Sequence, residues 1–313
     1  MGVKQERIVK NLSVYGLTHC LIDATCIALV FALLTKYSLS GEYFFMLVIL
    51  YNILAFGTQP FFGFLSDKKQ IPKTTALVGI FLTILSLVTF FISPLITVIL
   101  LGFGNSLFHV GGGVISLNLT PKKATAPGIY VAPGTIGLFV GAIYGKSASF
   151  SIIPFFLLLA TSFYFVIVTK TPKIDYSKQK NKKINNYLEL VVLLLLFAIA
   201  IRALIGTVIV FPWKTNFALS IILILGIFLG KALGGIFADK FGWIKVGTFS
   251  LVASSVLLAF GSSNPFSGVL GIFLFNMAMP ITLIAVSNTL QGYPGFSFGL
   301  TTLALIAGAL PMF

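Results

Sequence analysis

Charged residues are what this chain has least of. Only 9% of its 313 residues are Asp, Glu, Lys or Arg, and just seven are acidic. Soluble domains carry roughly 25% charged residues, so a soluble globular protein is excluded. Hydrophobic residues make up 58% of the chain, and they recur in runs of about 20, the length that crosses a hydrocarbon core as a helix. The sequence therefore predicts an all-α polytopic membrane protein.

Cysteine and the motifs of catalysis are scarce as well. The two cysteines, Cys20 and Cys26, lie six residues apart in one predicted helix, a spacing that forms neither a CxxC motif nor a zinc site. The chain has no GxxxxGK(S/T) loop that would bind a nucleotide, and it shows no nucleophile–base pair and no metal-ligand cluster. We expect neither an enzyme nor a resident metal or cofactor, and we expect a proton gradient to supply the energy.

Long apolar runs are abundant, and we predict eleven membrane spans. Their residue ranges are 12–35, 42–65, 74–93, 94–119, 127–145, 151–169, 187–211, 217–237, 246–261, 265–290 and 295–313. The first run follows three basic residues, but it is longer than a signal-peptide core and many similar runs follow it. We therefore interpret it as a span.

The basic residues lie predominantly on one side of these spans. If the N-terminus is cytoplasmic, 16 of the 21 lysines and arginines fall in cytoplasmic segments, in agreement with the positive-inside rule. Only Arg202 and Lys231 fall within spans. Orientation in the plasma (cytoplasmic) membrane thus explains the net charge of +14, and we expect no nucleic-acid partner.

A repeat divides the chain into two halves. Gly63, Asp67, Lys68 and Lys73 recur 172 residues later as Gly235, Asp239, Lys240 and Lys245. Six spans separate the copies, so the repeat is parallel, which is typical of the major facilitator fold with its two six-helix halves. We predict an N-terminal half at 1–169, a basic cytoplasmic linker at 170–186 and a C-terminal half at 187–313. The sixth span has no counterpart, so we expect that the twelfth helix is missing and that the second half is truncated.

The eight repeated residues form a predicted gating motif. In each copy a carboxylate at a helix end, held by bases and by the N-terminus of a neighbouring helix, can latch the two halves in one state. Two rows of glycines at four-residue spacing predict close helix packing. They are Gly137, Gly141 and Gly145, and Gly226, Gly230 and Gly234.

Titratable side chains are predicted near the middle of the membrane. His19 and Asp23 lie one turn apart on one helical face, and a charged carboxylate there costs about 2.5–3.5 kcal/mol unless it is paired, protonated or hydrated. We expect His109 and Arg202 to face the same central cavity. His19, Asp23 and His109 are the predicted proton carriers, since histidine titrates near physiological pH. Arg202 would bind an anion or balance Asp23, with structural hydrogen bonds or a salt bridge as the alternative roles.

Three motifs resemble the fosmidomycin-resistance group of major facilitator drug antiporters. The group's S-H-x-x-N-D in helix 1 is matched by His19 and Asp23. Its Q-P-x-x-G-x-x-x-D-K is matched by Gln59, Pro60, Gly63, Asp67 and Lys68. Its helix 4 pattern G-x-G-x-S-x-F-H is matched by Gly102, Gly104, Ser106, Phe108 and His109. The resemblance implies proton-coupled efflux by alternating access.

The departures from that group concern the same helices. Its asparagine in helix 1 is Ile22 here, and its Pro-Glu-x-x-Arg after the histidine is replaced by Val-Gly-Gly-Gly-Val at residues 110–114. The acid and base of helix 4 are therefore absent, so this chain must handle protons differently or carry another substrate. We expect the three glycines either to leave a cavity wall bare of side chains, open to a bulkier substrate, or to let the helix bend.

Taken together, these features favour a secondary active transporter that exports a small amphiphilic or anionic compound in exchange for protons. One charge moved through 100 mV yields about 2.3 kcal/mol, enough for roughly 50-fold accumulation. A proton-coupled importer of a metabolite or sugar would show the same composition and charge pattern. A non-transporting membrane scaffold or sensor is the rival from another class, but it has no reason to keep two histidines, an aspartate and an arginine in the membrane core. We expect a monomer in the lipid bilayer.

Overall fold

The computed structural model describes residues 3–174, 176 and 187–312, which are mostly helical, are joined by short turns and include no strand. Nine helical segments among them are long and apolar enough to cross a membrane, and two shorter apolar helices accompany them. The first half contains α1 (Val3–Lys36), α2 (Gly41–Asn52), α3 (Gln59–Lys69), α4 (Pro72–Thr89), α5 (Pro94–Leu119), α6 (Thr125–Gly145) and α7 (Ile153–Val168). The second half contains α8 (Tyr187–Val208), α9 (Phe217–Phe241), α10 (Trp243–Gly261), α11 (Pro265–Thr289) and α12 (Pro294–Ala309). Short 3-10 turns lie at Pro212–Thr215 and Leu310–Met312.

The second span contains an irregular turn. A short π-helix at Ile53–Gly57 joins α2 to α3, so that Gly41–Lys69 runs as one continuous span. A π turn inserts one extra residue per turn and often marks a functional position in a helix. The apolar pattern of the sequence indicates the span but not this turn.

Local capping explains why several helices begin where they do. Pro94 and Pro265 occupy the first turns of α5 and α11, where the N–H that proline lacks would have no helical partner. The residue before each proline is the cap: the Ser93 side chain accepts a hydrogen bond from the N–H of Ile96, and Asn264 caps α11 in the same way. The predicted starts of these two spans coincide with the observed ones.

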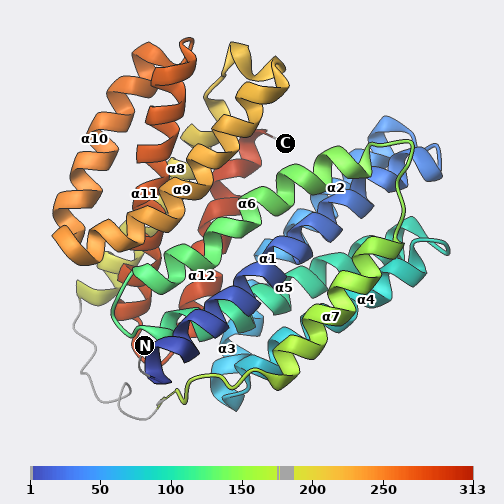
Figure 1. Ribbon diagram of the computed structural model, residues 1–313, viewed down its shortest axis with the longest axis horizontal. Helices are drawn as coiled ribbons and strands as arrows, with labels where there is room; N and C mark the ends of the chain where they lie inside the picture. Colours follow the sequence, from blue (N-terminus) through green and yellow to red (C-terminus); the bar gives the residue numbers. More distant parts are fainter. Residues whose placement is uncertain (1–2, 175, 177–186, 313) are drawn as a thin grey trace.

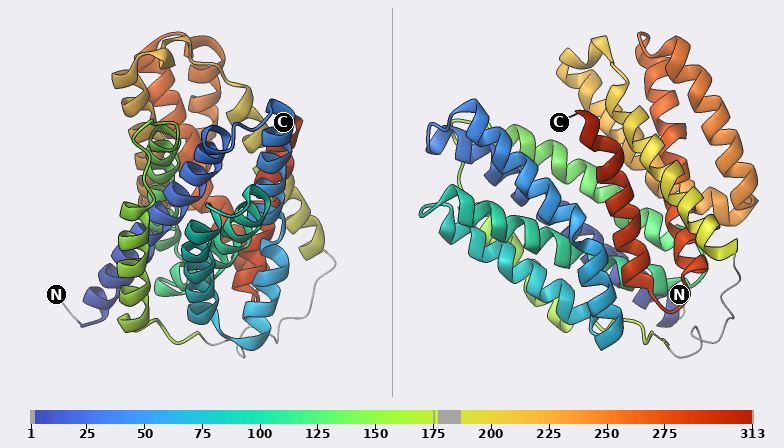
Figure 2. Two further views of the ribbon diagram at one scale, coloured as in Figure 1. Left: turned by 90° about the vertical axis from the view of Figure 1, so that its right-hand side faces the viewer. Right: turned by 180° about the vertical axis from the view of Figure 1, so that it is seen from behind.

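The two halves stand side by side (Figure 1). We call the end of the molecule that carries Arg7, Lys68, Lys122 and Lys240 the basic face, and the other end the opposite face. The halves touch mainly through α6 against α9 and α3 against α12. Figure 2 shows that they approach one another at the basic face and diverge toward the opposite face.

The glycine rows bring helix backbones into direct contact. Gly137, Gly141 and Gly145 of α6 each lie against a backbone carbonyl of α1, and a Cβ at any of them would overlap that carbonyl. Gly230 and Gly234 of α9 lie equally close to the backbone of α11. The packing role predicted for these glycines is thus confirmed.

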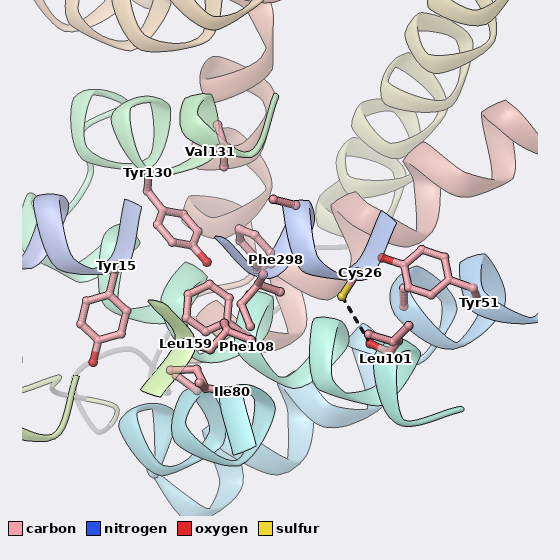
Figure 3. Packing of buried hydrophobic residues seen from close by; sticks show 14 of the residues in the cluster. Tyr15, Cys26, Tyr51, Ile80, Leu101, Phe108, Tyr130, Val131, Leu159 and Phe298 are labelled. Atoms are coloured by element: carbon pink, nitrogen blue, oxygen red, sulfur yellow. Dashed lines mark hydrogen bonds between the residues drawn. The ribbon is translucent and has the colours of Figure 1, made fainter. Parts of the chain in front are cut away.

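Aromatic side chains fill the centre of the molecule (Figure 3). Tyr15, Phe108 and Tyr130 are fully buried in the first half. Phe298 of α12 reaches the same cluster from the second half, with its ring centroid 6.3 Å from that of Tyr130. The core therefore continues across the contact between the halves.

The stretch at residues 111–113 does not form a bare wall. Gly111 lies against the backbone of α4, Gly112 against the hydroxyl of Tyr130, and Gly113 against the ring of Phe298. The absence of a Cβ admits these neighbours at close range, so the space is filled by protein. The expectation that these glycines leave room for a bulkier substrate is wrong, because aromatic groups of α6 and α12 occupy it.

The described part of the linker packs on the basic face. Arg7 donates hydrogen bonds to the carbonyls of Lys170 and Thr171, and Asn11 donates to Lys170 at 3.1 Å. Tyr176 is buried, and burial raises the pKa of its hydroxyl, so the phenol stays neutral. Most of the predicted linker at 170–186 lies outside the described residues.

Candidate functional site

Three titratable side chains from α1 and α5 meet in the first half. His19 Nε2 lies 3.2 Å from Asp23 Oδ2, and His109 Nε2 lies 3.4 Å from Asp23 Oδ1. The two Nε2 atoms are 2.8 Å apart. Each of the three residues is only 5–6% exposed. We call this group the His–Asp–His cluster.

The other ring nitrogens of the cluster determine where its hydrogens lie. His19 Nδ1 is 2.8 Å from the carbonyl oxygen of Tyr130, and His109 Nδ1 is 2.8 Å from that of Asn105. A carbonyl oxygen only accepts hydrogen bonds, so both Nδ1 atoms carry hydrogen. In neutral rings both Nε2 atoms would then present lone pairs to each other and to the carboxylate. The cluster therefore requires an additional positive charge between the two rings.

A proton fits this position better than a metal ion does. Two histidines and a carboxylate are donors that a divalent transition metal accepts, and the three ligand atoms do lie close together. Nitrogens bound to one tetrahedral zinc ion at about 2.0–2.1 Å would, however, be roughly 3.3 Å apart. The observed Nε2–Nε2 distance of 2.8 Å is that of a hydrogen bond.

Two neighbours complete the polar surroundings of Asp23. The Asn105 side chain donates to Asp23 Oδ1 at 3.1 Å, while its own Oδ1 is buried without a partner. Tyr130 stacks on the His19 ring, with centroids 4.9 Å apart. These contacts fix the orientation of the imidazole and of the carboxylate in a buried interior.

A glycine makes room for the cluster on the α6 side. A Cβ at Gly134 would lie 2.5 Å from Asp23 Oδ2 and 2.6 Å from His19 Nε2. Since neither polar atom belongs to a side chain that can move freely, only glycine fits here. The backbone of α6 thus covers the cluster directly.

Arg202 lies apart from the cluster, on α8. It lines a small cavity of about 30 Å³ together with Val131, Phe298 and Thr301, and its Nε atom is buried without a partner. The ion pairs that Asp23 makes in the described structure are with the two histidines. The alternative in which Arg202 balances Asp23 is therefore not observed in the described residues.

A second cation, Lys231 of α9, reaches across the contact between the halves. Its Nζ donates to Thr135 Oγ1 of α6 at 2.8 Å, and it is close enough to Arg202 and Asp23 for their charges to interact. The second half thus contributes two cations, Lys231 and Arg202, near the contact between the halves, and the first half contributes one carboxylate, that of Asp23.

The two aspartates of the repeated motif each hold a helix end of the opposite half. Asp67 accepts hydrogen bonds from the N–H groups of Gly295 and Phe296, at 3.0 and 2.9 Å, at the start of α12. Asp239 accepts from the N–H groups of Ala124 and Thr125, at 2.9 and 2.8 Å, at the start of α6. A carboxylate at a helix N-terminus satisfies free N–H groups and the helix dipole. We call these contacts the two anchors.

The glycines of the motif allow the anchors to form, whereas the lysines act elsewhere. A Cβ at Gly63 or Gly235 would overlap the backbone of the helix that the aspartate holds. Lys73 donates to the carbonyls of Ile167 and Thr169, at 2.6 and 3.0 Å, at the end of α7. In the described residues no lysine pairs with Asp67 or Asp239 within 4.0 Å, so bases do not hold these carboxylates as we expected. Lys68, Lys240 and Lys245 lie near the same basic face.

Two further residues of the site, Asn105 and Lys231, are marked in the sequence although they are not among the predicted site residues. Asn105 precedes His109 by one helical turn, the spacing at which side chains on a helix meet. Lys231 is a charge within an apolar span, which by itself marks a functional position. Thr135 and Tyr130 have no such signal, because only the packing of α6 against α1 and α9 brings them to the site.

Comparisons by sequence identify no relative. No protein-family profile matches the chain, and no curated protein matches it by sequence.

Comparison with solved structures identifies the fold. The human organic anion transporter MFSD10 superposes with a TM-score of 0.70 at 14% identity, covering 99% of this chain and 93% of that one. A variant of the E. coli fucose:proton symporter FucP gives 0.67 at 13% identity, and FucP in the outward conformation gives 0.68 at 12%. Both comparisons cover 95% of this chain and 90% of FucP. The chain therefore has the major facilitator fold of a multi-pass membrane protein, as the sequence predicts.

Proposed function

We propose that this protein is a secondary active transporter that exports a small anionic or amphiphilic compound in exchange for protons, by alternating access. The observation that carries the proposal is the His–Asp–His cluster, in which both Nδ1 atoms donate to backbone carbonyls and the two Nε2 atoms face each other at 2.8 Å.

The charge of the cluster follows from its protonation. With both histidines neutral its net charge is that of the Asp23 carboxylate, and one added proton on a ring makes the whole group neutral. A neutral group is far less costly than a charged one in the membrane interior. The cluster is thus suited to take up a proton when the transporter faces one side and to release it when the environment changes.

The structural neighbours support transport but leave its direction open. The neighbours are an organic anion transporter and a fucose:proton symporter, and the two cations of the second half favour an anion here. Efflux rests on the three motifs shared with the fosmidomycin-resistance group. A proton-coupled importer remains the second candidate, favoured by the likeness to a symporter.

The anchors supply the proposed gate. Both aspartates join the halves at the basic face, and alternating access requires these contacts to break when that face opens. We propose that this face is cytoplasmic, since basic segments stay on the cytoplasmic side of a plasma membrane. The observed state, joined at the basic face and diverging at the other, is then outward-facing.

The experiment that tests the function is a proton-flux measurement in proteoliposomes that contain the full chain and an internal pH dye. A panel of phosphonates, carboxylates, amphiphilic drugs and sugars is added outside. Proton movement opposite to the added compound is expected, and movement with the compound would establish the importer instead. If folded protein produces no substrate-dependent flux of protons or of any panel compound, the transporter proposal is wrong and the scaffold interpretation takes its place.

A further inference from the structure

An apolar groove runs between the halves along α6 and α9. It has a volume of about 540 Å³ and lies between α6 and α9, lined by Ile136, Phe139, Ile143, Phe217, Ile221 and Leu225 among others. Its rim is open, since Ile143 is 46% exposed and Leu225 44% exposed. We call it the α6–α9 groove.

The groove lies on the bilayer side of the contact between the halves. The α6 residues that line the groove lie on a different face of the helix from the glycine row, which packs on α1. They also lie on a different face from Val131, which lines the Arg202 cavity. Phe139 and Phe217 stack across the two helices, with centroids 6.3 Å apart. Both rings belong to the lining of the groove.

A cation lies at the inner end of this groove. Thr135 is one turn from Phe139 along α6, and Lys231 is two turns from Ile224 along α9, so both continue the lining toward the basic face. The hydrogen bond between Lys231 and Thr135, at 2.8 Å, therefore lies where the groove approaches the central cations. A hydrocarbon chain in the groove would end near this ammonium group.

The charge balance of the interior indicates what binds there. Asp23 is already paired with two histidines. Among the described residues no carboxylate forms an ion pair with Lys231 or Arg202, and Arg202 Nε is buried without a partner. Isolated cations are costly in a membrane interior. An acidic head group placed between these cations would neutralise part of that charge, while its chain occupied the apolar lining.

We propose that the substrate is a single-chain amphiphilic anion, with its acidic head group bound by Lys231 and Arg202 and its chain in the α6–α9 groove, through which it passes between the central site and the outer half of the bilayer. This inference rests on the proposed transport function and specifies its substrate class. Lys231 is then a binding residue that sets specificity for anions.

A second groove of nearly the same size provides the control. It has a volume of about 560 Å³, lies between α9 and α11, and is lined by apolar residues that include Ile222, Leu229 and Phe266. Neither groove has a cation in its lining, but Lys231 bonds to Thr135 of α6 and so lies on the side of the α6–α9 groove. Bilayer chains that merely fill surface grooves would occupy both grooves equally.

The test is photolabelling of the full chain in phosphatidylcholine nanodiscs with a dodecanoate that carries a terminal diazirine. Labelled peptides are identified by mass spectrometry. We expect labelling of α6 and α9 at the α6–α9 groove. An excess of unlabelled dodecanoate should prevent this labelling, and dodecyltrimethylammonium should not.

Lys231→Met should weaken capture about tenfold, equivalent to about 1.4 kcal/mol, and Lys231→Arg should restore it. Ile143→Trp should reduce capture by filling the groove, and Leu229→Trp should leave it unchanged.

The outcomes separate the substrate class from the transport function. Equal labelling of both grooves, or capture that neither Lys231→Met nor Ile143→Trp reduces, would overturn the inference. Proton-coupled flux of butyrate equal to that of dodecanoate would also overturn it, while the proposed function stands. Specific capture of dodecanoate without any accompanying proton flux would instead overturn the proton coupling and keep the binding site.

Discussion

At the scale of single residues, the carboxylate of Asp23 has three polar neighbours and almost no contact with solvent. Both histidine rings and the amide of Asn105 direct N–H groups or lone pairs at it from α1 and α5. Every hydrogen in this group has a defined partner except the one that the two Nε2 atoms must share. Replacing one carboxylate oxygen of Asp23 by an NH2 group therefore changes how many protons the whole cluster binds.

Replacing Asp23 by Asn should remove coupling without removing the fold. The amide keeps the shape of the side chain but carries no negative charge. A protonated imidazole is then no longer stabilised, so the rings bind the additional proton more weakly. Accumulation driven by a 100 mV gradient should fall from roughly 50-fold to equilibration, as measured by substrate uptake into energised proteoliposomes.

The matched control for this variant is Glu42→Gln, which neutralises an exposed carboxylate in the first turn of α2. It should accumulate substrate as the unaltered protein does. Normal accumulation by Asp23→Asn would show that Asp23 takes no part in coupling.

Gly134→Ala should disturb the cluster from the side of α6. The added methyl would lie within 2.6 Å of both Asp23 Oδ2 and His19 Nε2, and such overpacking costs about 1–3 kcal/mol. A lower melting temperature and weakened coupling are expected together. Gly41→Ala, at a glycine with no neighbour within 4 Å, should change neither, and equal behaviour of the two variants would contradict the tight fit at Gly134.

The sequence predicts the members of the cluster better than their surroundings. His19 and Asp23 are one turn apart, and the predicted places of helices 1 and 4 in the fold bring His109 near them. The fit at Gly134 and the reach of Lys231 to Thr135 depend on side chains from helices far apart in the chain. No local pattern encodes these contacts.

At the scale of helices, the two anchors act as caps supplied from outside the helix. Asp67 belongs to α3 and holds the start of α12, while Asp239 belongs to α9 and holds the start of α6. Because the repeat is parallel, the two contacts are equivalent, and each joins one half to the other. The stability of the closed basic face is thus shared between two similar interactions.

Asp67→Ala and Asp239→Ala should each favour opening of the basic face. Loss of a cap costs about 0.5–2 kcal/mol, which shifts the equilibrium between the states by roughly 2- to 30-fold. A cysteine at Ser287, in the cavity between α5 and α11 at that face, should react faster with a thiol reagent in either variant. The measurement uses a background in which Cys20 and Cys26 are alanine.

The double variant distinguishes a gate from a fold defect. If both aspartates hold one closed state, the two shifts in free energy should add, and the protein should still melt cooperatively. Unchanged reactivity at position 287 in both single variants would contradict the gating role.

Helix boundaries follow from the sequence where capping signals are strong. Ser93 and Pro94 start α5 where predicted, whereas α1 begins well before the predicted residue 12. The polar residues Arg7 and Asn11 lie outside the apolar run, yet they continue the helix because they hydrogen-bond to the linker. The π turn at Ile53–Gly57 has no comparable signal.

At the scale of the whole molecule, the distribution of bases predicts the orientation. With a cytoplasmic basic face, a cysteine at Lys122 should be protected from an impermeant maleimide in intact cells, because the membrane separates them. A cysteine at Ser149, on the opposite face, should be labelled. Labelling of both positions after the cells are opened is the control, and the reverse pattern in intact cells would contradict the orientation.

The repeat of 172 residues is sufficient to predict the two-half architecture, and the structure confirms the major facilitator fold. Composition and hydropathy indicate the spans because the bilayer demands apolar helices. The contact between the halves includes close backbone approaches at Gly63 and Gly235, and these become apparent only in three dimensions.

The anchors also have a consequence for the electrical state of a cell. A group that binds protons in the middle of a membrane becomes a leak if water reaches it from both sides at once. Because Asp67 and Asp239 close one face from two separate helices, loss of a single anchor weakens that closure, and loss of both weakens it further. A cell that produces the double variant, in which both Asp67 and Asp239 are alanine, should lose part of its membrane voltage and grow slowly, even where no substrate is present.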